Sequence, residues 1–73
     1  MRGMIELASR LSGTLHVALL WIRETDAFAV SVEDSSTGDR FELVVEDRSN
    51  ALDIFYHPYA YAALRGVDYA RAA

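Results

Sequence analysis

Residues 14–23 (TLHVALLWIR) constrain the fold most, because a strand formed by them would be apolar on both faces. Successive side chains of a strand point to opposite sides of the sheet. One side would carry Leu15, Val17, Leu19 and Trp21, and the other would carry His16, Ala18, Leu20 and Ile22. A strand of this kind lies inside a sheet that is covered on both faces. The sequence therefore predicts a layered fold in which this strand is packed on each side.

Two further stretches have the alternation of half-buried strands, namely residues 27–33 (AFAVSVE) and 40–46 (RFELVVE). The segments between the strands, 24–26 and 34–39 (DSSTGD), are short and polar, as turns are. The buried face of the expected three-stranded antiparallel meander would carry Phe28, Val30, Val32, Phe41, Leu43 and Val45. Its other face is apolar at the first strand and charged at the third, so the apolar end needs a cover.

Residues 1–11 fit both a helix and a strand. A helix would place four apolar residues on one side: Met4, Leu7, Ala8 and Leu11. In a strand, Ser9 would fall on the buried face. We therefore predict a short N-terminal helix that Gly13 terminates. The alternative is a hairpin that turns at Ser12 and Gly13 and gives a four-stranded antiparallel sheet.

Residues 49–66 (SNALDIFYHPYAYAALRG) predict a C-terminal helix that is kinked or broken at Pro58 and packs on one face of the sheet. Asn50 is a good N-cap, and Asp53 would lie in the first turn, where the helix dipole favours a carboxylate. Pro58 donates no hydrogen bond and clashes with the preceding turn. A second helix could begin at Pro58 and end at Gly66, with the tail 67–73 beyond it.

The two sides of this helical stretch are both apolar. The predicted buried stripe is Leu52, Phe55, Tyr56, Tyr59 and Ala63. Ile54, Tyr61 and Leu64 lie off the stripe, and a helix that is apolar nearly all round is buried on more than one side. This pattern favours contact with a second subunit or another protein.

Length and composition support one small α+β domain, 1–73, that self-associates. Hydrophobic residues make up 52% of the 73 residues, and there is no cysteine to supply a disulfide. The net charge of −4 argues against binding a nucleic-acid backbone, which needs a basic patch. The apolar runs are shorter than the roughly 18 residues of a membrane span, and Glu6 and Arg10 interrupt any secretory leader. We therefore expect a cytoplasmic protein without nucleic-acid or membrane partners.

The candidate chemistry is sparse. Asp53 and His57 lie four residues apart, where a carboxylate could orient an imidazole for catalysis or metal binding. A metal site wants a third ligand, and His16 is the only other histidine, so a helix-capping carboxylate and an exposed histidine are the simpler interpretation. The acidic residues of the second hairpin are better explained as a solvated sheet edge than as a calcium loop or a basic-partner surface: Glu33, Asp34, Asp39, Glu42, Glu46 and Asp47.

Three stretches carry a resemblance to a known group of proteins: FYHPYAYA at residues 55–62, LLW at 19–21 and FELVV at 41–45. With them the chain resembles short uncharacterised actinobacterial proteins from residue 14 onward. The resemblance implies no activity and assigns no catalytic residue.

The sequence thus favours a non-enzymatic protein-interaction module that forms a homo-oligomer, such as a homodimer, or docks on a larger protein, with no cofactor or metal. The expected binding residues are Tyr61, His57, Ile54, Leu64, Leu20 and Ile22. One alternative is a small-ligand or metal-binding protein that uses Asp53 and His57. Another is an acidic inhibitor or antitoxin-like protein.

Overall fold

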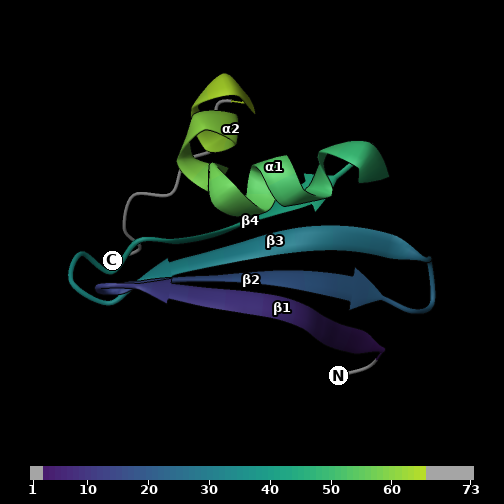
Figure 1. The fold of residues 1–73 in the computed structure, drawn as a ribbon, viewed down its shortest axis with the longest axis horizontal. Helices are drawn as coiled ribbons and strands as arrows, with labels where there is room; N and C mark the ends of the chain where they lie inside the picture. The colour runs from purple at the N-terminus through teal and green to yellow at the C-terminus, as the bar shows by residue number, and fades with distance from the viewer. Residues whose placement is uncertain (1–2, 66–73) are drawn as a thin grey trace.

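A four-stranded antiparallel sheet carries two short helices on one of its faces in the computed structural model, which describes residues 3–65 (Figure 1). The strands are β1 (Met4–Ser12), β2 (Leu15–Ile22), β3 (Ala27–Asp34) and β4 (Arg40–Val45), paired in chain order. A 3-10 turn, η1 (Arg48–Asn50), leads into α1 (Ala51–Tyr56) and α2 (Pro58–Arg65). Gly66 and the tail 67–73 lie outside the described residues. The α+β class and the three strands of the predicted meander, β2, β3 and β4, are confirmed.

The N-terminal residues form a strand, so the prediction of an N-terminal helix is wrong and the four-stranded alternative is confirmed. The pairing of β1 with β2 shifts by one residue between Glu6 and Ala8, which is a β-bulge. An inserted residue reverses the alternation, so Ser9 faces away from the core although Ile5 faces toward it. The turn to β2 uses Gly13 at φ 61°, a conformation that glycine adopts at little cost.

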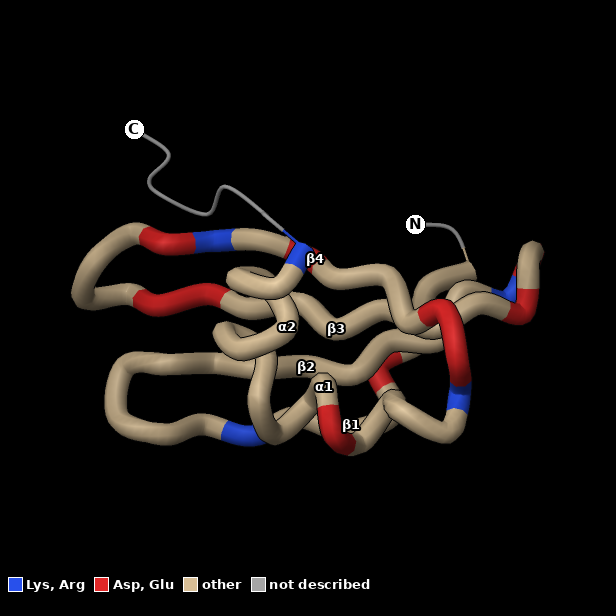
Figure 2. Tube along the Cα trace, turned by 90° about the horizontal axis from the view of Figure 1, so that it is seen from above, with Lys and Arg blue, Asp and Glu red and all other residues tan. Residues whose placement is uncertain are grey.

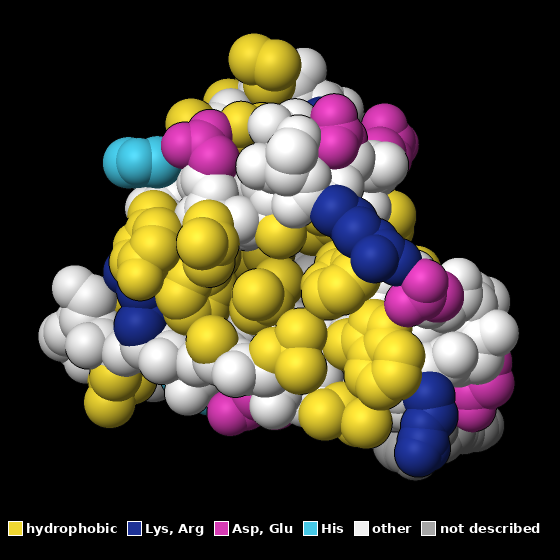
Figure 3. Space-filling model, turned by 45° about the vertical axis from the view of Figure 1, so that its right-hand side comes forward, with side chains coloured by type: hydrophobic (Ala, Val, Ile, Leu, Met, Phe, Trp, Pro, Cys, Tyr) yellow, Lys and Arg dark blue, Asp and Glu magenta, His cyan; other side chains and the backbone are white. Residues whose placement is uncertain are grey.

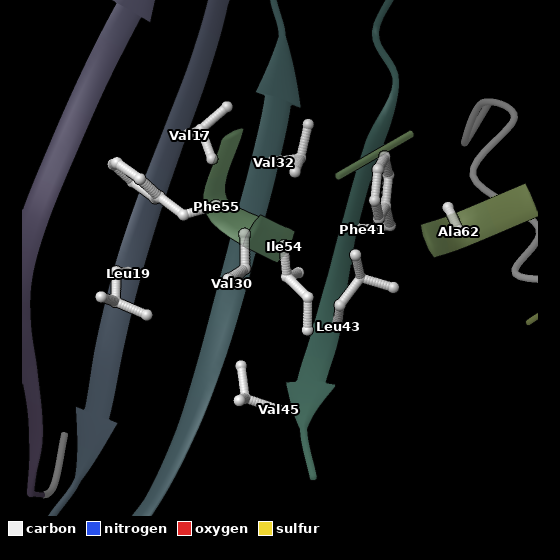
Figure 4. Packing of buried hydrophobic residues seen from close by; sticks show 10 residues of the cluster. All are labelled: Val17, Leu19, Val30, Val32, Phe41, Leu43, Val45, Ile54, Phe55 and Ala62. Carbon is white, nitrogen blue, oxygen red and sulfur yellow. The ribbon is translucent and has the colours of Figure 1, made fainter. Parts of the chain in front are cut away.

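The core lies between the sheet and the helices (Figure 4). Its strand residues are those that the alternation predicts, and the helices add three more; the cluster is Val17, Leu19, Val30, Val32, Phe41, Leu43, Val45, Ile54, Phe55 and Ala62. Burying one such large side chain stabilises the fold by about 1.5–3 kcal/mol. The helical layer is therefore held mainly by apolar contact with β2, β3 and β4.

The predicted break at Pro58 is confirmed, because α1 ends at Tyr56 and α2 begins at Pro58. His57 between them has φ −134° and ψ 52°, outside the helical region, and its backbone N–H donates to the Asp53 carbonyl at 2.9 Å. The capping role of Asn50 is not observed, since its side chain makes no cap hydrogen bond. Asp47 caps the preceding 3-10 turn instead, accepting from the Ser49 backbone N–H at 3.1 Å.

The buried stripe of the helices differs from the predicted one. Leu52, Tyr56 and Ala63 are exposed, so their assignment to the buried side is wrong. The residues that pack on the sheet follow helical spacing one position away: Ala51, Ile54, Phe55, Pro58 and Ala62. Burial of a tyrosine costs free energy unless its hydroxyl finds a partner, whereas isoleucine has no such requirement. That difference favours Ile54 over Tyr56 as the core residue.

The two helices cover the sheet unequally. Helix α1 lies over β2 and β3, and α2 lies against β4, where the Arg65 guanidinium donates to the Val44 carbonyl at 2.7 Å. Strand β1 reaches the helices through Arg10. Both helices lie on the same side of the sheet, so within residues 3–65 no element covers its other face (Figure 1). Viewed from above the helices, charged positions gather at the hairpin ends and turns, and the middle of each strand is largely uncharged (Figure 2).

Candidate protein-interaction surface

The six residues that the sequence nominates for binding are distributed over the core and two surfaces. Leu20 and Ile22 point to the uncovered face of the sheet, where both are partly buried. His57 and Leu64 are exposed on the helical layer, Leu64 at 80%. Ile54 is 1% exposed and packs in the core, so its assignment to a partner surface is wrong. The structure therefore does not bring these residues together into one site.

Tyr61 is half-buried against the core, and its hydroxyl donates a hydrogen bond to the Asp53 carboxylate. This bond to Asp53 raises the pKa of Tyr61, because deprotonation would place two negative charges side by side. The side chain that was expected to orient His57 is thus engaged by Tyr61. No group of three or more histidine, aspartate or glutamate side chains among residues 3–65 could hold a metal ion.

The uncovered face, which we call the open face, changes in character along the strands. Cross-strand pairing places two rows at its apolar end, Met4–Ile22–Ala27 and Glu6–Leu20–Ala29–Val44. Two more rows form its polar end, Ser9–Ala18–Ser31–Glu42 and Leu11–His16–Glu33–Arg40. The ion pair between Glu33 and Arg40 spans 3.0 Å on this end. The open face is therefore an apolar half joined to an acidic half.

A second apolar surface lies on the helix-facing side of the sheet, at the end that the helices do not reach. The cross-strand row there is Ile5–Trp21–Phe28–Val45. Exposure rises along this row, from Val45 in the core through the partly buried Phe28 and Trp21 to Ile5 at 38%. The neighbouring row on the same face, by contrast, is buried on three of its four strands; this row is Ala8–Leu19–Val30–Leu43. The helical layer thus ends short of β1.

Helix α1 adds two side chains to this surface. Leu52 and Tyr56 are four residues apart and share one flank of the helix, and they are 59% and 56% exposed. The Arg10 guanidinium of β1 lies 5.5 Å from the Tyr56 ring centroid, so this flank faces β1. We call the combined surface the aromatic patch: Ile5, Trp21, Phe28, Leu52 and Tyr56. Figure 3 shows hydrophobic side chains gathered between the helices and the sheet, with charged side chains at the margin.

One end of the aromatic patch is fixed by a carboxylate. Asp26, in the left-handed region at φ 55°, accepts from the Trp21 indole N–H at 2.8 Å and from the Arg48 guanidinium. The Trp21 bond and then the Arg48 bond lower the pKa of Asp26. The Arg48 guanidinium also lies 5.0 Å from the Phe28 ring centroid, a cation–π distance. The Trp21 and Phe28 rings are therefore held in place by contacts within the fold.

The other end is fixed by Arg10. Its guanidinium donates to the Phe55 carbonyl from Nε at 3.1 Å and from Nη2 at 3.0 Å, and to the Tyr56 carbonyl at 3.3 Å. These carbonyls belong to the last turn of α1, where a cation complements the helix dipole. The same group lies 5.6 Å from the Phe55 ring centroid. Arg10 thus ties the edge strand to α1 and orders the Tyr56 end of the patch.

Three of the six acidic side chains of the second hairpin make contacts within the fold: Glu33 pairs with Arg40, and Asp34 and Asp47 accept hydrogen bonds in turns. Asp34 accepts from the Thr14 hydroxyl at 2.7 Å and from Ser36, and these bonds lower its pKa. The pKa of Asp47 is lowered by its bonds from Ser49. These contacts order turns, which supports the structural interpretation of the acidic residues.

Sequence reasoning missed the aromatic patch. It assigned four of the members to buried faces, namely Trp21, Phe28, Leu52 and Tyr56, and it gave Ile5 no role in binding. A second apolar stripe with the same helical spacing comprises Ala51, Ile54, Phe55, Pro58 and Ala62, and only this stripe leaves Leu52 and Tyr56 exposed; the spacing does not decide between the two stripes. The bulge in β1, which brings Ile5 and Arg10 to the same face, leaves no comparable pattern in the residues.

Comparisons with known proteins give no relative for this chain: no protein-family description, curated protein or solved structure matches it. The resemblance to actinobacterial proteins stays a prediction. Neither helix within residues 3–65 has the length and apolar composition that crossing a bilayer would take.

Proposed function

We propose that this chain is a small protein-interaction module without enzymatic activity, which works by self-association or by docking on a larger protein. The observation that carries the proposal is the amount of apolar surface that the described fold leaves exposed. Eight large apolar side chains are more than a third exposed: Met4, Ile5, Leu7, Leu11, Val44, Leu52, Tyr56 and Leu64.

The arrangement of these residues matters more than their number. Single exposed apolar residues are ordinary on protein surfaces, whereas contiguous apolar patches mark interaction sites. Here the aromatic patch gathers three of them, Ile5, Leu52 and Tyr56, and the apolar half of the open face contains two, Met4 and Val44. Aromatic residues and arginine dominate the binding energy of interfaces, and they are concentrated in and beside the aromatic patch. A protein partner therefore accounts for both surfaces.

The alternatives have less support. Ligand or metal binding through Asp53 and His57 would share the Asp53 carboxylate with the hydrogen bond from Tyr61. Of the six residues of an acidic inhibitor surface, Asp34 and Asp47 are engaged in hydrogen bonds that order turns, and Glu33 pairs with Arg40. Neither alternative accounts for the exposed apolar residues.

Size-exclusion chromatography with light scattering tests the proposal. We expect a molecular mass above the 8.2 kDa of a single chain, rising with protein concentration. A chain that stays at 8.2 kDa at every concentration and does not enhance the fluorescence of an apolar dye would contradict it.

A further inference from the structure

We infer that the aromatic patch is the surface through which two copies of this chain pair across a two-fold axis. The inference rests on the proposed function and assigns it a partner and a place. Two surfaces compete for this role, the open face and the aromatic patch, and their charges decide between them.

The open face is poorly suited to meet its own copy. It carries three carboxylates, of Glu6, Glu33 and Glu42, against Arg40, which already pairs with Glu33. Pairing two such faces would move these carboxylates into a partly desolvated interface, where an uncompensated charge costs several kcal/mol.

The aromatic patch, in contrast, has complementary ends. Arg10 lies at the Tyr56 end, and the partners that it contacts within the fold are carbonyl groups and rings. Asp26 lies at the Trp21 end, where it accepts from Trp21 and pairs with Arg48 at the exposed rim. A two-fold axis through the middle of the patch lays each end of one copy on the opposite end of the other. The Arg10 guanidinium of each copy then approaches the Asp26 carboxylate of its partner.

The exposed area fits a small, reversible dimer. A fully exposed large apolar side chain offers about 200 Å², so the exposed fractions of Ile5, Leu52 and Tyr56 together give roughly 300 Å². Trp21, Phe28 and the arginine stems bring each copy toward the approximately 500 Å² that a specific interface needs per side. An interface of this size dissociates on dilution.

The ordering of the patch lowers the entropy that pairing would cost. Asp26 holds the Trp21 ring through its indole N–H, and Arg10 holds α1 against β1. Side chains that are already fixed lose little rotamer freedom when a partner covers them. The patch therefore offers preordered aromatic and arginine side chains, the residue types that contribute most at interfaces.

Two matched substitutions test the inference. Leu52 and Val44 are almost equally exposed, at 59% and 58%, but Leu52 lies in the aromatic patch and Val44 on the open face. Sedimentation equilibrium over a concentration series should show a reversible dimer for the natural chain. We expect Leu52→Glu to raise the dimer dissociation constant at least about tenfold, and Val44→Glu to leave it within about twofold. A glutamate at position 52 lies in the first turn of α1, where it suits the helix dipole, so the fold should be retained.

The outcomes separate the inference from the proposed function. If Val44→Glu dissociates the dimer and Leu52→Glu does not, the interface is the open face; the inference is then wrong while self-association stands. A natural chain that is monomeric at all concentrations overturns the inference and leaves docking on another protein as the proposed function. Circular dichroism of each variant checks that any dissociation does not come from unfolding.

Discussion

Two neighbouring cross-strand rows of the same sheet face differ in burial. Ala8–Leu19–Val30–Leu43 lies under the helical layer and forms core, whereas Ile5–Trp21–Phe28–Val45 extends beyond it and becomes surface toward β1. Both rows are apolar on every strand. Position under the helices, rather than residue type, decides which row is buried and stabilises the fold and which row stays partly exposed.

The largest expected effect is in the covered row. Leu43 is 1% exposed, and Leu43→Ala should lower the free energy of unfolding by about 2–5 kcal/mol, through lost burial and the cavity that remains. Ile5→Ala in the uncovered row should cost about 1 kcal/mol or less. Urea unfolding of both variants measures the difference.

Both unfolding curves should be taken at protein concentrations low enough to keep the chains monomeric. If Leu43→Ala leaves too little folded protein, Leu43→Val provides a milder version of the same comparison. Equal losses for the two rows would mean that Ile5 is part of the core, and the contrast between the rows would fail.

Loss of the hydrogen bonds from Arg10 of β1 to the last turn of α1 should have the next largest effect on the free energy of unfolding. Arg10→Ala removes the guanidinium from the last turn of α1 and should lower the free energy of unfolding by about 1–2 kcal/mol. Arg10→Lys keeps the charge but not the paired donors, so it should recover part of that loss. Unfolding of both variants in urea checks the order. If Arg10→Ala is neutral, β1 is attached to the helices by some other contact.

The sequence predicts the buried residues of the covered row but not the exposure of the uncovered one. Alternation in residues 27–33 and 40–46 predicts β3, β4 and their buried side chains, and Pro58 predicts the break between α1 and α2. These signals are local, and the structure confirms them. They reveal the core but not its boundary.

The unpredicted part depends on the bulge and on the phase of α1. A single inserted residue in β1 makes its apolar pattern look helical, because Ser9 then falls out of the alternation that starts at Ile5. The phase of α1 depends on which of several apolar residues packs best on the sheet. Ile54 is buried whereas Leu52 and Tyr56 are exposed, and this outcome depends on tertiary packing against the sheet. The aromatic patch results from both decisions, so it could not be read from local patterns.

The smallest expected effect is electrostatic and lies at the Trp21 end of the patch. The pKa of Asp26 is lowered in the folded chain, as are those of Asp34 and Asp47. Because the folded state binds these protons less readily than the unfolded state, the stabilisation is present above about pH 4 and is lost as pH falls through the folded pKa values.

Asp26→Asn should therefore make the acid-induced loss of stability slightly shallower than in the natural chain. Thermal unfolding between pH 6 and pH 2.5, in steps of about half a pH unit, measures it. A steeper loss in the variant would show that the carboxylate is not stabilised by Trp21 and Arg48.

The fluorescence of Trp21 tests the central claim most directly, because this is the only tryptophan in the chain and it lies in the uncovered row. We expect its emission to move to shorter wavelength as the concentration of the natural chain rises. Leu52→Glu should abolish this shift, and Val44→Glu should preserve it. Emission that is independent of concentration in a chain that sedimentation shows to be dimeric would place the contact elsewhere and contradict the account.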